Sequence, residues 1–166
     1  MTNVLDRALR ILELLAVQAE GLPLHAIADR LGMPRSAAHR MLADLARQGY
    51  VRQARDGGDY LLTIKLVSLG LTYLAQNGIL DIAQPILDRL AAATGELVRL
   101  GVVDGDRLTW VAKAQGARSG LRYDPDAGAD AHLASTANGH AWLSTLTEEE
   151  ALALVSRQGF GDPRQL

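Results

Sequence analysis

Five polar residues have the spacing of a single helical face. Arg35, Ser36, His39, Arg40 and Arg47 stand at i, i+1, i+4, i+5 and i+12, with no carboxylate among them before Asp44. Positions so spaced share one side of an α-helix. Their side chains donate hydrogen bonds, and arginine can donate two to O6 and N7 of guanine. This face therefore predicts contact with base edges and phosphates in a DNA major groove, with Arg40 as a candidate for bidentate guanine contact.

An apolar face lies opposite these donors and extends into the preceding segment. A short helix is predicted to end at Gly32, a Gly-Met-Pro turn follows, and a second helix runs to Gly49. The apolar positions recur at helical spacing and are Ile27, Ala28, Leu31, Ala38, Met41, Leu42 and Leu45. The pattern predicts a helix-turn-helix that buries one side of its second helix.

A hairpin pattern follows directly. Residues 50–55 and 59–62 flank the turn sequence Asp56-Gly57-Gly58, which is typical of a β-hairpin. A hairpin after a recognition helix is a wing, and its Arg52 and Arg55 are predicted to reach phosphates or a minor groove, as Arg47 is to reach phosphates. Residues 30–55 hold six arginines against one acid, Asp44, so their net charge is 6 − 1 = +5. This basic patch favours DNA binding although the whole chain has a net charge of −2.

Simpler interpretations of these residues stay open. A basic helix face is often only a solvated face, and Arg40 could pair with Asp44 at i+4. His39 could contact a phosphate or solvent alone.

Composition restricts the remaining classes of function. The chain of 166 residues suits one to two domains, and it contains no cysteine, which excludes disulfides and thiolate zinc sites. The four histidines lack metal-ligand spacing, and no nucleophile motif is present, so we expect no metal, no cofactor and no enzyme activity. Without a transmembrane run or a signal peptide, we expect a cytoplasmic protein that does not enter membranes.

Flanking elements are predicted from periodicity and capping signals. One helix should run from Asn3, as N-cap, to Ala19, with an inward stripe of Val4, Ala8, Ile11, Leu12 and Leu15. Another should cover 64–76 as a linker or dimer helix, with an apolar stripe of Leu66, Leu69, Tyr73 and Leu74. A third should start at Asp81, with Gln84 completing a capping box, and end at Gly95.

The C-terminal half predicts a helix-flanked antiparallel sheet. Segments 97–103 and 107–113 flank Asp104-Gly105-Asp106 as a second hairpin, and 120–123 is a candidate short strand. A helix should start at Ser135 or Thr136, and Thr147-Glu148-Glu149-Glu150 should cap the last one.

With these residues in view, the chain resembles the IclR family of bacterial transcriptional regulators. The likeness rests on several blocks in the right order: Val4–Leu15, Ala28–Gly32, Pro34–Leu42, Leu45–Val51, Pro85–Leu90, Thr94–Glu96 and Ala134–Ser144. It implies an α+β fold with three parts. These are a winged helix-turn-helix at 1–63, a linker or dimerisation helix at 64–78, and the N-terminal part of a GAF-like effector-binding domain at 79–166.

The resemblance also implies partners. It suggests a pseudo-palindromic double-stranded DNA operator, a homodimer or dimer of dimers, and a small carboxylate effector near Ser135, Thr136, Ala137 and Asn138. A helix start offers free N–H groups to an anion, although N-capping by Ser135 or Thr136 explains the same residues.

Three departures from the family pattern qualify the expectation. Ala37 replaces a more usual threonine and could remove one polar contact, and His140 stands where lysine is common. The effector domain is also expected to be truncated, because the family's continues well past Leu166. The alternative function is therefore a dimeric DNA-binding protein that senses no ligand.

Overall fold

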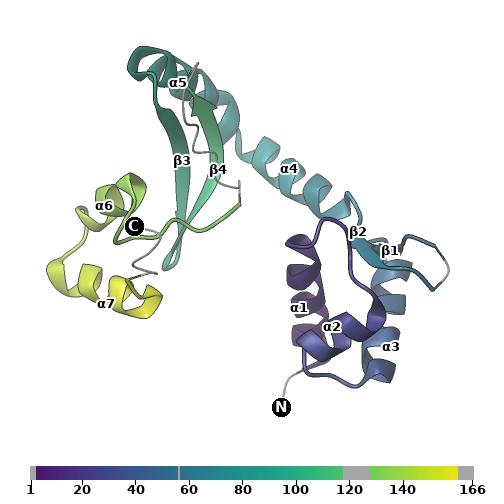
Figure 1. Cartoon of the computed structure of the whole chain (residues 1–166). Helices are drawn as coiled ribbons and strands as arrows, with labels where there is room; N and C mark the ends of the chain where they lie inside the picture. Colours follow the sequence, from purple (N-terminus) through teal and green to yellow (C-terminus); the bar gives the residue numbers. More distant parts are fainter. Residues whose placement is uncertain (1–2, 56, 118–127, 161–166) are drawn as a thin grey trace. The chain divides into compact units, whose positions relative to one another are not determined.

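A computed structural model describes residues 3–55, 57–117 and 128–160. The chain divides into two compact units, Met1–Gln76 and Asn77–Leu166, and each is described by itself (Figure 1). Both combine helices with a small antiparallel sheet, so the predicted α+β class is confirmed.

The first unit is a helix-turn-helix followed by a hairpin. Its elements are α1 (Val4–Ala16), α2 (Leu24–Arg30), α3 (Arg35–Arg47), β1 (Val51–Gln53), β2 (Tyr60–Leu62) and α4 (Lys65–Asn77). The strands pair antiparallel, with Arg52 opposite Leu61. Figure 1 shows the hairpin projecting beside the helices, where a wing was predicted.

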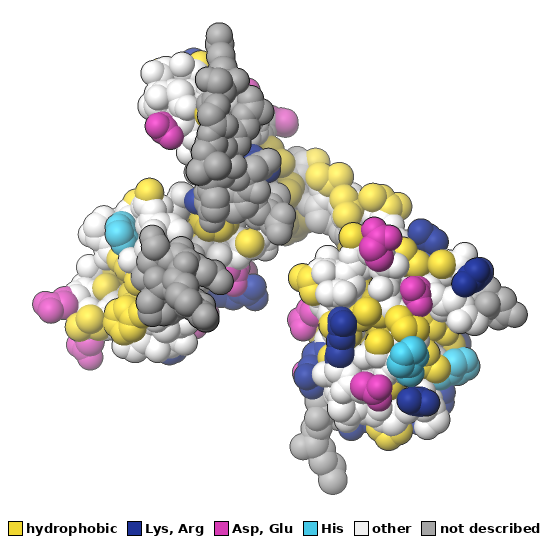
Figure 2. All heavy atoms as spheres, viewed as in Figure 1, with side chains coloured by type: hydrophobic (Ala, Val, Ile, Leu, Met, Phe, Trp, Pro, Cys, Tyr) yellow, Lys and Arg dark blue, Asp and Glu magenta, His cyan; other side chains and the backbone are white. Residues whose placement is uncertain are grey.

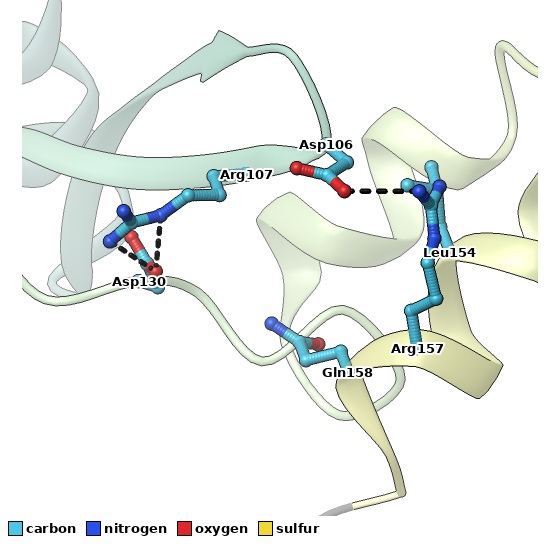
Figure 3. Close-up of a pocket in the computed structure, with 6 residues that line it drawn as sticks. All are labelled: Asp106, Arg107, Asp130, Leu154, Arg157 and Gln158. Carbon is cyan, nitrogen blue, oxygen red and sulfur yellow. Dashed lines mark hydrogen bonds and ion pairs between the residues drawn. The ribbon is translucent and has the colours of Figure 1, made fainter. Parts of the chain in front are cut away.

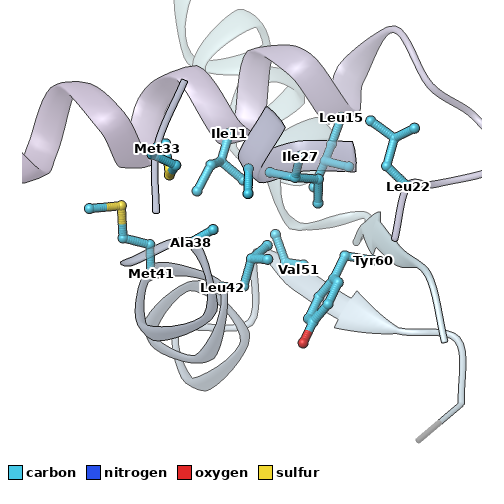
Figure 4. Close-up of a cluster of buried hydrophobic side chains, with 11 residues drawn as sticks. Ile11, Leu15, Leu22, Ile27, Met33, Ala38, Met41, Leu42, Val51 and Tyr60 are labelled. Carbon is cyan, nitrogen blue, oxygen red and sulfur yellow. The ribbon is translucent and has the colours of Figure 1, made fainter. Parts of the chain in front are cut away.

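One apolar cluster holds the three helices and the hairpin together (Figure 4). Ile11 of α1, Ile27 of α2 and Leu42 of α3 are fully buried, and Val51 and Tyr60 close the cluster from the hairpin. The predicted apolar positions of α2 and α3 all belong to it, with Leu31 and Leu45 partly buried at its edge. Because one side of α3 is buried in this cluster, the opposite side of the helix faces outward.

A tight turn connects α1 to the sheet. Leu22 and Tyr60 exchange backbone hydrogen bonds of 3.0 and 2.8 Å. Gly21, just before this bridge, has φ +81°, and a Cβ there would lie 2.7 Å from the Tyr60 carbonyl oxygen. Glycine is needed here both for its backbone conformation and for the space it leaves.

The second unit is built on a longer hairpin. It contains α5 (Ile79–Thr94), β3 (Leu97–Asp104), β4 (Arg107–Gln115), α6 (Ala137–Leu143) and α7 (Glu148–Gln158). Leu87 and Ala91 of α5 pack against Ala114 on one face of the hairpin. A second cluster joins Leu108 and Trp110 to residues around α6 and α7, which lie near the turn end of the hairpin in Figure 1.

The predicted start of α5 is wrong. Helix α5 begins at Ile79 after Gly78, whose left-handed backbone ends α4, so Asp81 lies in the first turn and does not cap it. The predicted capping box is absent because the Gln84 amide donates to the Asp88 carboxylate (2.9 Å) and the Lys113 carbonyl (3.2 Å). Asn3 occupies the N-cap position of α1, but its side chain makes no cap bond.

The predicted inward stripe of α1 also extends too far toward the N-terminus of the helix. Val4 is 68% exposed, whereas Ile11 and Leu15 are buried; Val4 lines an open pocket beside Met41 and Leu45 of α3. The helix ends at Ala16, three residues earlier than predicted. The candidate strand 120–123 lies outside the described residues.

The capping box of α7 is confirmed. The Thr147 hydroxyl accepts from the Glu150 backbone N–H, and the Glu150 carboxylate accepts from the Thr147 N–H at 3.0 Å. These hydrogen bonds lower the pKa of Glu150. A lowered folded-state pKa contributes stability above the ordinary pKa of glutamate, and that contribution is lost as pH falls through the lowered value.

No single helix in the described ranges is long and apolar enough to cross a membrane; only α4 and α5 taken together, across the break at Gly78, meet those criteria.

Two glycines with positive φ provide a matched test of the turn at Gly21. Gly32 has φ +60° and nothing within 4 Å of an added Cβ. We expect Gly32→Ala to lower the free energy of unfolding by about 1 kcal/mol, the cost of left-handed backbone. Gly21→Ala should cost clearly more, because its methyl group meets the Tyr60 carbonyl. Urea unfolding of both variants measures the difference, and equal losses would show that the close approach is unimportant.

Candidate nucleic-acid interface

Helix α3 divides into two opposite arcs. At about 100° per residue, its core residues Ala37, Ala38, Met41, Leu42 and Leu45 span about 140° of the helix circumference. The five predicted DNA-facing residues span a separate arc of about 140°, and all five are exposed. The structure therefore brings Arg35, Ser36, His39, Arg40 and Arg47 onto one solvent-facing surface, hereafter the α3 outer face.

The carboxylate beside this face pairs with a different arginine than the sequence suggested. Asp44 forms an ion pair with Arg47 at 2.9 Å, and both side chains are more than 60% exposed. Arg40 makes no ion pair with a described residue. Asp44 was predicted to compete with DNA for Arg40, but it pairs with Arg47 instead. An exposed pair contributes little to stability, and Arg47 can exchange Asp44 for a phosphate at small cost.

Small residues leave room on the α3 outer face. Ala43 is exposed and lies near the middle of the outer arc, which sequence analysis did not note. Ala37, where a lost polar contact was expected, is 92% buried (8% exposed), and a threonine hydroxyl there would not lie on the outer face. Figure 2 shows basic and histidine side chains with hydrophobic ones on the visible side of the first unit.

The hairpin adds two more basic residues. Val51 and Tyr60 point into the core, at 2% and 8% exposure, so Arg52 between Val51 and Gln53 points outward and is exposed. Arg55 is also exposed, at the start of the turn. The turn is fixed by a 3.0 Å bond from the Gln53 amide to the Gly58 carbonyl.

Polar contacts connect the C-terminus of α3 to the start of α4. The Lys65 ammonium donates to the Gln48 carbonyl at 2.6 Å and lies 4.4 Å from the Tyr50 ring centroid. The Thr63 hydroxyl donates to the Gly49 carbonyl at 2.5 Å and accepts from the Lys65 N–H. These bonds satisfy carbonyls at the end of α3 and attach the first turn of α4 to it.

In the second unit, two of the four proposed effector residues are engaged locally. The Thr136 hydroxyl accepts from Gly139 N–H at 3.1 Å and donates to the His132 carbonyl at 2.8 Å, so Thr136 is the N-cap of α6. Ser135 bonds the His132 ring at 2.9 Å. Ala137 is exposed and Asn138 is half-buried. His140, the departure from lysine, places its Nε2 2.9 Å from the Ala134 carbonyl.

A pocket of about 240 Å³ lies between the β3–β4 turn and α7 (Figure 3). Its arginines already have acidic partners, since Arg107 pairs with Asp130 at 2.8 Å and Arg157 with Asp106 at 3.1 Å. With its positive charge matched by carboxylates, this pocket is poorly suited to an acidic ligand.

Sequence analysis missed a cation stacked on an aromatic ring. The Arg99 guanidinium of β3 lies 3.5 Å from the Trp110 ring centroid of β4. Neither residue belongs to a motif, and only the register of the two strands brings them together.

A winged helix-turn-helix with a basic outer face, joined to a separate α+β unit, defines a class of transcriptional regulators. Family models match both units: the IclR helix-turn-helix domain over residues 4–55 and the bacterial transcriptional regulator IclR C-terminal domain over residues 71–160. The chain belongs to the IclR family of transcriptional regulators, as the sequence blocks indicated. This family is one of regulators and not of enzymes.

Individual relatives agree with this membership. The acetate operon repressor of Salmonella typhimurium is 30% identical over 156 residues, 93% of this chain and 57% of the repressor. An IclR family regulator from Brucella abortus has a TM-score of 0.72 at 26% identity, covering 95% of this chain and 59% of its own. A homologue from Microbacterium hydrocarbonoxydans, solved with 4-hydroxybenzoate, shares the fold with a TM-score of 0.77 at 19% identity, over 93% and 63%. The chain spans a little over half the length of these proteins.

Arg40 and Arg52 provide a test of base contact against phosphate contact. We expect Arg40→Ala to cost about 1–3 kcal/mol of binding to the operator and much less on random DNA, because the predicted base contact would be lost. Arg52→Ala should weaken binding to both DNAs about equally. Gel-shift titrations on the two DNAs measure this, and equal losses for Arg40→Ala would make Arg40 a phosphate contact.

Proposed function

We propose that this protein binds an operator in double-stranded DNA through the α3 outer face and the β1–β2 wing. The observation that carries the proposal is the α3 outer face itself. It presents three arginines, a serine and a histidine, all exposed, and Asp44, the one acid within α3, is paired with Arg47. Ser36, His39 and Arg40 are the proposed base readers, with Arg35 near the start of the helix.

The remaining cations suit the phosphate backbone. Arg47 lies at the C-terminal end of α3, and Arg52 and Arg55 extend from the wing. Phosphate contacts of this kind set the register of a recognition helix without reading sequence. In this division of roles, residues 1–63 bind DNA, 64–78 link, and 79–166 sense a ligand.

We further propose a homodimer, or a dimer of dimers, in the cytoplasm. The support is exposed apolar surface on two helices of the first unit. Leu5 and Leu9 of α1 are 63% and 49% exposed, and α4 has no buried residue, with Leu69 and Tyr73 at 50% and 68%. Exposed apolar side chains at i and i+4, as in each of these two helices, are typical of an interaction site when they join into one patch. Two-fold pairing would place recognition helices on half-sites about 34 Å apart.

The proposed effector is a small organic acid. A homologue with the same fold was solved with 4-hydroxybenzoate, and the C-terminal family model covers residues 71–160 here. The start of α6, Ser135–Asn138, is the proposed wall of the site. Because Thr136 and Ser135 already make bonds within the chain, Asn138 is the member best placed to meet a ligand.

Salt dependence tests the DNA-binding proposal. If about four to six phosphates are neutralised per unit, log K should fall with log salt with a slope of about −4 to −5. Gel-shift titration across salt concentrations measures the slope. Arg55→Gln should reduce its magnitude by about 1, and Arg89→Gln, an exposed change on α5, should leave it unchanged. A slope near zero would overturn the assignment of the basic residues.

Light scattering tests the dimer. We expect a dimer or larger assembly at tens of micromolar protein, and dissociation in a Leu5→Glu/Leu9→Glu variant, because two charges would be buried at the interface. Val17→Glu is the control, since Val17 is 76% exposed at the other end of α1. A monomeric unaltered protein, or equal behaviour of the two variants, would contradict the proposed interface.

A further inference from the structure

Ala43 is an apolar residue near the middle of the α3 outer face. At about 100° per residue, it lies on the arc between His39 and Arg47. Ala43 is exposed and lies outside the apolar cluster to which α3 contributes Ala38, Met41 and Leu42 in Figure 4. Packing in the core of the first unit therefore does not explain an alanine at this position.

The position of Ala43 completes a spacing that suits a DNA groove. Ser36, His39, Arg40 and Ala43 stand at i, i+3, i+4 and i+7. In homeodomains, four side chains with this spacing on one helix read base edges in the major groove. Three of the four positions in α3 hold the proposed base readers, so we expect the fourth, Ala43, to meet a base edge as well.

Long side chains border Ala43 without covering it. Arg40 and Arg47 lie about 60° and about 40° around the helix from Ala43. Arg47 forms its 2.9 Å ion pair with Asp44, which lies about 100° from Ala43 in the same direction, so the guanidinium is drawn away from Ala43. A short residue bordered by long basic ones fits a groove that presents bases at its floor and phosphates along its edges.

The chemistry of a methyl group selects one feature of a base edge. In the major groove, only thymine presents a C5 methyl group, and alanine is one of the residues that contact it. Against the amino group of cytosine or the acceptors of guanine, an alanine would displace water without offering a hydrogen bond, which costs binding free energy. An exposed alanine among base readers therefore favours thymine.

Helix propensity also favours alanine on an exposed helix surface, and α3 contains a residue that controls for it. Ala46 is a second exposed alanine, about one turn closer to the C-terminus of the helix. Ala46 lies outside the i, i+3, i+4, i+7 set. The two alanines have the same helix propensity and differ only in position, so substitutions at both form a matched pair.

We propose that Ala43 is a specificity-determining residue of the operator contact, and that its methyl group packs against the C5 methyl group of one thymine in each half-site. This rests on the proposed binding of α3 to an operator, and it extends that proposal by naming a feature of the operator sequence. Arg40 reads guanine through hydrogen bonds in this arrangement, and Ala43 reads thymine through apolar contact in the same groove.

Removal of single thymine methyl groups tests the proposal. The probe is the tightest-binding duplex that the unaltered chain selects from a random-sequence DNA library. Each thymine of the probe is replaced in turn by deoxyuridine, which lacks only the C5 methyl group, and binding is measured by gel shift. At one thymine in each half-site, we expect deoxyuridine to weaken binding about fourfold, the effect of one buried methyl group.

Variants of the two alanines assign this methyl contact. The readout is the ratio of the dissociation constants for the deoxyuridine and thymine duplexes. A loss of folded protein cancels in this ratio, because both duplexes meet the same sample. Ala43→Gly should bring the ratio at that thymine from about fourfold to about one. Ala46→Gly should leave the ratio unchanged, although both substitutions lower helix stability similarly. Ala43→Ser, which disturbs the helix less than glycine, should also lower the ratio.

The outcomes separate this inference from the function it rests on. A selected duplex without thymine, equal binding of every deoxyuridine duplex, a ratio unchanged in Ala43→Gly, or an equal fall in Ala46→Gly would overturn the Ala43 contact. If Arg40→Ala still weakens binding to the same probe, the operator proposal stands and only the Ala43 proposal fails. If the unaltered chain selects no duplex from the library, both proposals fail.

Discussion

The burial of one side of α3 is the constraint on which the first unit depends. Ala28 of α2 and Ala38 of α3 are both fully buried, and their small side chains let the two helices approach closely. Ile11 and Leu42 fill the remaining space from α1 and α3. Because Ala38, Met41 and Leu42 are buried in this core, the rotation of α3 about its own axis is fixed. The hydrogen-bond donors on the opposite side of α3 therefore face solvent.

The same constraint extends to both ends of the helix-turn-helix. Gly21 lets the chain come close enough to Tyr60 for the hairpin to close the core. At the other end, Lys65 and Thr63 bond the last carbonyls after α3, so the first turn of α4 is attached to the recognition helix. A change in the direction of α4 would therefore act on α3 through hydrogen bonds and not through a loose linker.

The arrangement of the second unit depends on a β-bulge, in which β4 has one extra residue opposite Leu100 and Gly101. Without the bulge at Leu100 and Gly101, Trp110 would lie on the face that packs against α5. The bulge turns it to the face of Arg99, and Gly101 leaves room for Asn138 to approach. One irregularity of pairing thus places Arg99 of β3 and Trp110 of β4 on the face of the hairpin that Asn138 of α6 approaches.

The sequence by itself determined the helix-turn-helix, the wing and the outer face of α3. These depend on local periodicity and turn chemistry, which neighbouring residues encode. It also determined the Thr147–Glu150 cap, a contact within one helical turn. It did not determine where α5 starts, because Gly78 ends α4 and leaves Gln84 free to bond across to β4. The sequence also did not predict that Asp44 pairs with Arg47 and not with Arg40, since both arginines lie within reach of Asp44 along the helix. Only the tertiary structure brought Arg99 onto Trp110, because strand register and a bulge join residues that no local pattern relates.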